Sequence, residues 1–256
     1  MSSLRIAVAG KGGAGKTTLS ATLARLMARQ GRDVTVIDGD SNPNVAVALG
    51  VDPALADRLE PLPTSLVSRR LGGAALREPV DEVLATHSIP APDHVRVLMM
   101  CMPKHADEGC LCTSHATVAG LMNDLASRED SVTILDLEAS PEHLSRGTTR
   151  NVDALLLVIE PYYRSYETAK RMAALAAELP ISRVAVVANK LRTPADGEAI
   201  RQYCELNRLN LDGELPWSDA ALNADREGVP LLDYDPSDPL VAAISKVADK
   251  LTARAH

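Results

Sequence analysis

Short apolar runs alternate with longer amphipathic stretches along most of the 256 residues. The apolar runs are rich in β-branched residues and nearly continuous in hydrophobicity, as expected of strands that are covered on both faces. Strand–helix alternation of this kind predicts a doubly wound α/β fold with a mostly parallel sheet. The predicted strands are Leu4–Ala9, Val34–Asp38, Val95–Met100, Val132–Leu137, Ala154–Ile159 and Val184–Ala188, and the predicted helices are Thr17–Gln30, Thr113–Ala126, Ser165–Glu178 and Asp196–Leu206.

The chain shows no repeat or linker that would divide it, so residues 1–256 are predicted to form a single domain. Asp52–Pro92 is rich in Pro, Ala and Arg and is the least regular region, which indicates a mobile insertion. Near the C-terminus, apolar residues recur at helical spacing, which fits either a membrane-binding amphipathic helix or a final helix packed on the core. Asp249 and the lack of bulky aromatics favour the core-packed helix.

The amino-acid composition argues against several classes of function. The chain has no Phe and only 2% aromatic residues, so stacking platforms for single-stranded nucleic acid are not expected. The net charge of −7 gives no general attraction to nucleic acid or to anionic lipid. Neither a signal-peptide pattern nor a long apolar run is present, so we expect a cytoplasmic protein without stable membrane insertion and without a nucleic-acid partner.

A phosphate-binding loop lies between the first predicted strand and the first predicted helix. Residues Gly10–Thr17 satisfy the pattern G-x-x-x-x-G-K-[ST], whose glycines let backbone N–H groups surround phosphate oxygens at a helix N-terminus. Lys16 is expected to contact the β- and γ-phosphates, and the Thr17 hydroxyl to ligate Mg²⁺. The sequence thus predicts ATP and Mg²⁺ as cofactors. The loop residues predicted to bind nucleotide are Gly12, Gly13, Ala14, Gly15, Lys16, Thr17 and Thr18.

The same glycines also fit a dinucleotide-binding turn. Gly10, Gly12 and Gly15 have the spacing G-x-G-x-x-G, and Asp38 ends the second predicted strand, where an acidic residue binds ribose in that fold. A pyrophosphate-binding turn needs no lysine and hydroxyl at the start of the helix, whereas Mg-triphosphate needs both. The Lys16-Thr17 pair therefore favours an ATPase.

The run K-G-G-x-G-K-T-T at Lys11–Thr18 resembles the deviant Walker A motif of the family that contains MinD, ParA, nitrogenase iron protein and the CooC-type ATPases. The resemblance implies a homodimer in which Lys11 reaches the nucleotide phosphates of the partner subunit. It also implies that Asp40 positions or activates the attacking water, with Asp38 as a helper. The alternatives are a solvated loop lysine and acidic residues that only cap helices or turns. The catalytic residues predicted in this way are Lys11, Lys16 and Asp40.

The resemblance supplies the rest of the nucleotide site. Asp136, at the end of a predicted strand, resembles the Walker B aspartate that holds Mg²⁺ through water. Asn189-Lys190 resembles the element that recognises the base; GTPases continue it as N-K-x-D, whereas Arg192 stands at the fourth position here and favours adenine. The stretch Pro216–Asp219 resembles a P-x-D loop that frames the base, although a generic turn is the alternative. Its predicted binding residues are Pro216, Trp217 and Asp219.

Cys110 and Cys112 lie directly before a predicted helix. Residues two apart in extended chain point the same way, and the helix N-terminus favours thiolates, the form that binds metal. Two thiolates are half of a tetrahedral site, and a two-fold dimer would supply the other two. We therefore expect zinc or a similar metal ion bridging two subunits, and the resemblance to the CooC-type ATPases implies nickel. Two unligated buried cysteines, a redox pair and a bridging iron–sulfur cluster are the alternatives. The flanking His105 and His115 are expected to be surface or capping residues.

Within this family, a C-x-C at this point resembles the CooC-type ATPases. That resemblance implies an ATP-hydrolysing metallochaperone or maturation factor that inserts nickel into a client metalloenzyme, carbon monoxide dehydrogenase being the example. A MinD/ParA-like regulator of positioning and an ATP-driven electron donor are the alternatives. Tyr162, Tyr163 and Tyr166, clustered in a chain with few aromatics, indicate either a contact surface or local packing.

Overall fold

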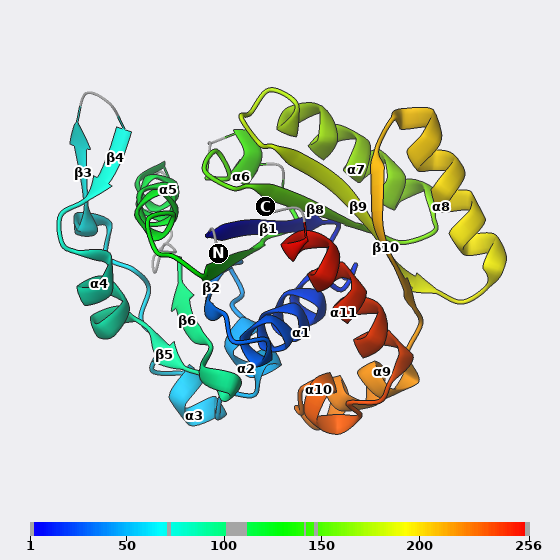
Figure 1. Cartoon of the computed structure of the whole chain (residues 1–256), viewed down its shortest axis with the longest axis horizontal. Coiled ribbons are helices and arrows are strands. Elements are labelled where there is room, and N and C mark those ends of the chain that lie inside the picture. Colours follow the sequence, from blue (N-terminus) through cyan, green and yellow to red (C-terminus); the bar gives the residue numbers. More distant parts are fainter. Residues whose placement is uncertain (1–2, 71–72, 101–111, 141, 146–147, 254–256) are drawn as a thin grey trace.

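An eight-stranded sheet forms the centre of the molecule (Figure 1). The computed structural model describes residues 3–70, 73–100, 112–140, 142–145 and 148–253. The strand order is β10-β9-β8-β1-β7-β2-β6-β5, and every neighbouring pair is parallel except β5 with β6. The predicted doubly wound α/β fold is confirmed. The strands are β1 (Leu4–Gly10), β2 (Asp33–Gly39), β5 (Ile89–Pro90), β6 (Arg96–Met99), β7 (Ser131–Leu137), β8 (Ala154–Ile159), β9 (Arg183–Leu191) and β10 (Asn210–Pro216).

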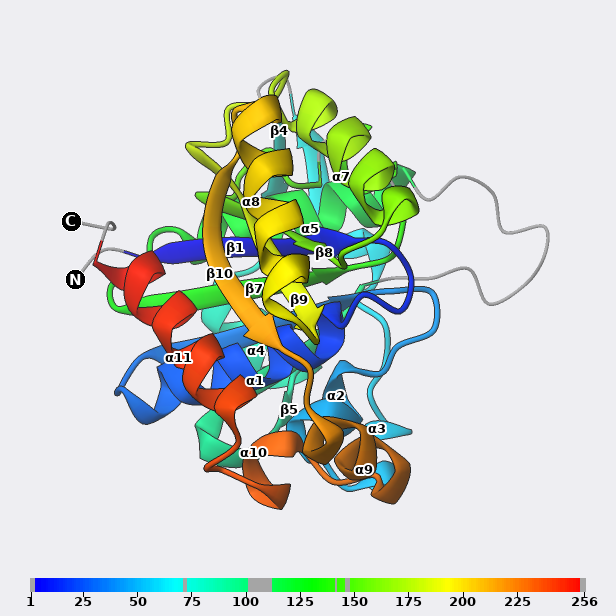
Figure 2. The ribbon, with the colours of Figure 1, turned by 90° about the vertical axis from the view of Figure 1, so that its right-hand side faces the viewer.

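Helices cover both faces of this sheet, as the two views show (Figures 1 and 2). One apolar layer lies under α1 (Lys16–Arg29), α2 (Val45–Leu49), α3 (Pro53–Ala56), α9 (Asp219–Glu227), α10 (Leu231–Tyr234) and α11 (Pro239–Thr252). The other lies under α4 (Val80–His87), α5 (Cys112–Leu125), α6 (Glu142–Ser145), α7 (Tyr163–Ala176) and α8 (Pro194–Asn207).

Strand β1 shows why the apolar runs are continuous. Its residues Ile6 and Val8 join the first layer, whereas Ala7 and Ala9 join the second, and all four are buried. Successive side chains of a strand point to opposite faces, so a strand covered on both sides favours apolar residues at successive positions. The burial of both faces follows directly from the strand–helix alternation.

The edge strand β10 was not predicted from the sequence. Its residues Asn-Leu-Asp-Gly-Glu-Leu-Pro lack a β-branched run, and several are half-exposed, as is common at a sheet edge. Gly213 within it permits close packing by α11, because a Cβ there would lie 2.5 Å from Val247 Cγ2. Tertiary packing therefore makes this polar segment a strand.

The region 52–92 is more regular than expected. It contains α3, α4, β5, two short 3-10 helices, η1 (Thr64–Leu66) and η2 (Pro92–His94), and a hairpin of β3 (Val67–Arg70) and β4 (Gly73–Leu76) that lies beside α5 (Figure 1). Leu62, Leu66, Val83 and Leu84 from this region are buried in the second apolar layer. The segment is thus part of the packed body of the protein.

The last helix, α11, packs on the core as the sequence favoured. Leu240, Ile244, Val247 and Leu251 are all buried in the first apolar layer. Within the described ranges, every helix is too short or too polar to cross a bilayer.

Candidate nucleotide site

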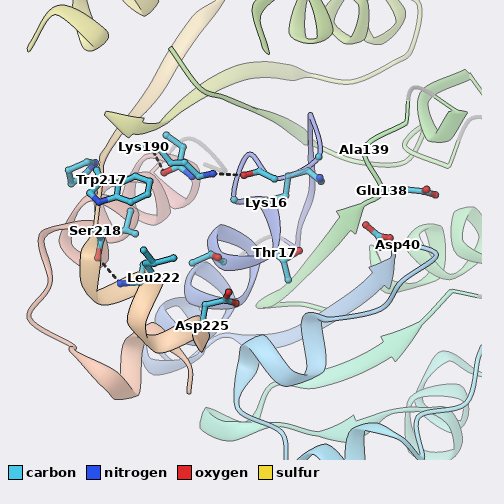
Figure 3. A pocket seen from close by; sticks show the side chains of 18 residues that line it. Lys16, Thr17, Asp40, Glu138, Ala139, Lys190, Trp217, Ser218, Leu222 and Asp225 are labelled. Carbon is cyan, nitrogen blue, oxygen red and sulfur yellow. Dashed lines mark hydrogen bonds between the residues drawn. The ribbon is translucent and has the colours of Figure 1, made fainter. Parts of the chain in front are cut away.

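A cavity of about 550 Å³ opens beside the carboxyl ends of β1, β2, β7 and β9, where open α/β sheets place their ligands (Figure 3). The chain segments that follow these strands line it, together with residues of α9 and α11. The cavity brings together most of the nucleotide-site residues predicted from the sequence. The lining residues are Gly12, Gly13, Gly15, Lys16, Thr17, Thr18, Asp40, Glu138, Ala139, Asn189, Lys190, Pro216, Trp217, Ser218, Ala221, Leu222, Asp225 and Leu240.

The phosphate-binding loop runs from the end of β1 into α1, which begins at Lys16. Gly15 has φ +94°, and a Cβ on Gly10 would lie 2.4 Å from the carbonyl oxygen of Val158. Side chains at either position would therefore strain the backbone or clash. Because α1 starts immediately after the loop, its first N–H groups lie next to the cavity, where they favour an anion.

Asn189 and Lys190, at the end of β9, hold the loop in place. The Asn189 side-chain amide donates to the carbonyl oxygen of Ala14 over 2.7 Å, and Lys190 Nζ donates to that of Gly13 over 2.5 Å. A Cβ on Gly15 would lie 2.3 Å from Asn189 Nδ2. The sequence predicted that Asn189 recognises the base. No sequence pattern indicated that Asn189 also contacts the phosphate loop.

A pair of hydroxyl groups on α1 faces the carboxylate of Asp136. Thr17 Oγ1 donates to Asp136 Oδ2 over 2.7 Å, and Ser20 Oγ donates to Asp136 Oδ1 over 2.8 Å. Burial raises the pKa of Asp136 to about 7, an effect that the neighbouring Asp38 carboxylate reinforces. Hydroxyl and carboxylate oxygens are the donors that Mg²⁺ prefers, so Thr17 and Asp136 fit the ion. Ser20 was missed from the sequence, because a serine inside a helix carries no motif.

Asp38 lies beside Asp136 in the paired strands β2 and β7. Its carboxylate accepts hydrogen bonds from the backbone N–H groups of Asp40, Asn44 and Val45, at 3.1, 2.9 and 2.9 Å. Burial raises the pKa of Asp38 to about 6 in spite of these donors. Asp38 thus caps the turn from β2 into α2 in this structure, and its role as a catalytic helper stays a prediction.

Asp40 and Glu138 line the phosphate end of the cavity (Figure 3). The Asp40 carboxylate accepts from the N–H of Asn42 over 2.9 Å, and Glu138 accepts from the Ser41 hydroxyl over 3.1 Å. A side-chain hydrogen bond therefore links the segment that follows β2 to the segment that follows β7. Glu138 was not among the predicted site residues.

The opposite end of the cavity is formed by Trp217 and Leu222. The Arg192 guanidinium lies 3.6 Å from the centroid of the Trp217 ring, and Trp217 Nε1 donates to Asp219 Oδ1 over 2.9 Å. Asp219 does not line the cavity itself; it fixes the indole that does. Asp225 of α9 also lines this part of the cavity (Figure 3), and no sequence pattern indicated it.

Lys11 is the predicted catalytic residue whose side chain does not line the cavity. Its ammonium lies 5.5 Å from the centroid of the Tyr162 ring and 3.5 Å from the Tyr162 hydroxyl. Tyr162 follows β8 and is half-exposed, whereas Tyr166 stacks on Tyr203 with centroids 4.7 Å apart. Within the tyrosine cluster, Tyr166 therefore serves local packing, whereas Tyr162 contacts the phosphate loop.

The cysteine pair falls mostly outside the described residues. Cys110 lies outside them, and Cys112 is the first residue of α5, with only its backbone described. Within the described ranges, no three His, Cys, Asp or Glu side chains are grouped to hold a metal ion. His105 also lies outside, and His115 differs from expectation: it is buried, with Nδ1 2.5 Å from Thr148 Oγ1 and its ring 4.9 Å from that of His143.

Comparison with known proteins identifies the family. The model of the CobQ/CobB/MinD/ParA nucleotide binding domain matches residues 6–231. The chain belongs to this family. It is 36% identical over 247 residues to the carbon monoxide dehydrogenase accessory protein CooC of Rhodospirillum rubrum, covering 91% of each chain. It is also 32% identical over 240 residues to an uncharacterized ATP-binding protein of Methanocaldococcus jannaschii, covering 89% of this chain and 91% of that one.

Solved structures of this family share the fold. MinD of Pyrococcus horikoshii, complexed with Mg-ADP, superposes with a TM-score of 0.73 at 17% identity over 99% of this chain and 97% of that one. MinD of Aquifex aeolicus gives 0.72 at 19% identity, with 98% and 97% covered. As a CobQ/CobB/MinD/ParA nucleotide binding domain with a complete phosphate loop, the chain is an ATPase that uses ATP and Mg²⁺.

Proposed function

We propose that this ATPase is a nucleotide-dependent homodimer that delivers a metal ion to a client metalloenzyme. Nickel is the proposed cargo and carbon monoxide dehydrogenase the proposed client. The observation that carries the proposal is the Cys110-Leu111-Cys112 sequence at the start of α5, in a chain 36% identical over most of its length to a carbon monoxide dehydrogenase accessory protein.

The proposed hydrolytic roles follow from the cavity. Lys16, largely buried at the start of α1, neutralises the β- and γ-phosphates, and the α1 N-terminus adds its partial positive charge. Thr17 and Asp136 hold Mg²⁺, which neutralises phosphate charge when bound. Asp40 lines the cavity at its phosphate end, where a carboxylate can orient the attacking water. The base lies against Trp217 and Leu222, where Arg192 replaces the guanine-reading carboxylate.

The proposed metal site lies on the same side of the sheet as the nucleotide. The chain leaves the carboxyl end of β6 and enters α5 at Cys112, and parallel strands have their carboxyl ends at one edge. Cys112, the first residue of α5, therefore lies on the nucleotide side of the sheet. If Lys11 reaches the partner's phosphates on this side, the two-fold axis also runs here, and two cysteine pairs can complete a tetrahedral thiolate site.

Metal stoichiometry tests this proposal. Reduced protein titrated with Ni²⁺ or Zn²⁺ should bind one ion per dimer, with affinity falling as pH drops because protons compete for the thiolates. Cys110→Ser and Cys112→Ser should each lose most of the affinity, since symmetry removes two of four ligands. Cys204→Ala is the matched control, because this cysteine is buried in α8 and burial raises its pKa to about 11.

The outcomes of the metal titration separate the proposed function from its alternatives. One ion per monomer, or unchanged binding in Cys112→Ser, contradicts the bridging site. Iron with sulfide in anaerobically purified dimer would indicate an electron donor. A dimer without any metal would favour a regulator of positioning or partner binding.

A further inference from the structure

A chain of polar contacts joins two positions of the phosphate loop through the segment that follows β8. Lys190 Nζ, bonded to the Gly13 carbonyl oxygen, also lies 3.1 Å from Glu160 Oε1. The Tyr162 hydroxyl donates to Glu160 Oε2 over 2.6 Å, and Lys11 Nζ completes the chain at 3.5 Å from the Tyr162 oxygen. Lys11 is therefore held by a residue of its own subunit, through groups that begin at the cavity wall.

The protonation state of Tyr162 suits this contact. Burial and the adjacent Glu160 carboxylate raise the pKa of Tyr162 to about 12, so the phenol keeps its proton at neutral pH. That proton is directed to Glu160, which leaves the phenol oxygen as an acceptor for the Lys11 ammonium. The ring adds a cation–π attraction at 5.5 Å. Both contacts are weak, as a reversible restraint requires.

We infer that Tyr162 is a positioning residue that retains Lys11 on its own subunit until nucleotide-dependent pairing draws the lysine away. This inference rests on the proposed function, in which Lys11 reaches the phosphates of the partner. Lys11 contacts Tyr162 and does not line the cavity of its own subunit, so in the inferred dimer it exchanges the Tyr162 contacts for a phosphate of the other subunit. A contact that stabilises the retained position acts once in each subunit, so it weakens the ATP-bound dimer by the square of its own factor.

Dimer affinity provides the first test. The Asp40→Ala background is expected to slow hydrolysis. In it, sedimentation with ATP should show a dimer that is about four- to 25-fold tighter for Tyr162→Leu, because each of the two subunits loses a contact worth about two- to fivefold. Tyr162→Phe keeps the ring and loses the hydroxyl, so its effect should have the same sign and be smaller. Tyr234→Leu is the control: Tyr234 has nearly the same exposed fraction, 38% against 39%, and its hydroxyl also lies near a glutamate, Glu227.

The reactivity of the Lys11 amine provides the second test and does not depend on dimerisation. In nucleotide-free protein, the rate of Lys11 acetylation by an N-hydroxysuccinimide ester, followed by peptide mass spectrometry, should rise in Tyr162→Leu and stay unchanged in Tyr234→Leu. Loss of a merely structural contact would lower the melting temperature without raising the reactivity of this one lysine.

Dimer affinity and Lys11 acetylation together test whether Tyr162 retains Lys11. Unchanged Lys11 acetylation in Tyr162→Leu would overturn the inference, and so would faster acetylation with an unchanged or weaker dimer. If the Asp40→Ala parent does not dimerise with ATP at all, the proposed function fails. The acetylation rate then shows by itself whether Tyr162 holds Lys11.

Discussion

The side-chain amide of Asn189 donates a 2.7 Å hydrogen bond to the carbonyl oxygen of Ala14, 175 residues earlier in the chain. This bond joins the end of β9 to the phosphate loop, and the close approach requires glycine at position 15. A residue predicted to recognise the base thus supports the backbone of the phosphate loop.

Asn189→Ala should lower the affinity for ATP by about two- to tenfold, the value of one hydrogen bond. Because the amide supports the phosphate loop, the affinity for GTP should fall by the same factor. Fluorescent-nucleotide binding measures both. Asn207→Ala is the control, since Asn207 donates a similar 2.8 Å bond to the Tyr203 carbonyl oxygen in α8, away from the cavity. A loss confined to ATP would show that Asn189 reads the base instead.

Hydrolysis should be slow with ATP and slower still with GTP. Arg192 occupies the position of the guanine-reading aspartate, and its guanidinium lies on the Trp217 ring. Lys16→Ala should abolish binding or turnover, because charge neutralisation dominates phosphoryl transfer. Steady-state phosphate release with each nucleotide measures this, with Lys170→Ala as a surface-lysine control. Equal turnover of ATP and GTP would remove the argument for adenine.

ATP should drive or tighten dimerisation, and Asp40→Ala should trap the dimer by slowing hydrolysis. Lys11→Gln should keep part of its ATP affinity but lose the nucleotide-dependent dimer, since its proposed partner phosphate lies in the other subunit. Sedimentation with and without ATP reads both effects, and Lys246→Gln on α11 serves as the control. Normal dimerisation of Lys11→Gln would show that this lysine has no role in the dimer and is only a solvated loop residue.

The stability of the magnesium-free protein should depend on the charge of Asp136. Its pKa is raised from 3.8 in the unfolded chain to about 7 in the folded protein. Between these values the folded state binds more protons, so the free energy of unfolding falls as pH rises from about 4 to 7. Asp136→Asn should remove that fall and be more stable than wild type at pH 8, by at least about 1 kcal/mol.

Urea unfolding in EDTA at pH 5, 6.5 and 8 measures this difference. Asp38, whose pKa is also raised by burial, acts in the same direction and is present in both proteins, so the difference between them reports Asp136 together with its coupling to Asp38. Parallel pH curves for the two proteins would show that burial of the Asp136 charge carries no such cost.

The sequence by itself determined the fold class and the phosphate end of the site. The strand–helix alternation and the Gly10–Thr17 loop are local patterns, and each acts through the backbone conformation of the residues that carry it. The resemblance to the family also predicted Asp136, which lies near the carboxyl end of β7. It could not separate a catalytic helper from a helix cap at Asp38, because both use the same carboxylate.

Only the tertiary structure decided which distant side chains meet. It made the polar segment Asn210–Pro216 an edge strand, and it turned Asn189 onto Ala14 and Lys11 onto Tyr162. It also placed Asp225 in the cavity, though no periodicity distinguishes this residue from other surface acids. These contacts depend on the packing of segments far apart in the chain. A pattern along the sequence describes only neighbouring residues, so it cannot show which distant polar groups come within hydrogen-bonding distance.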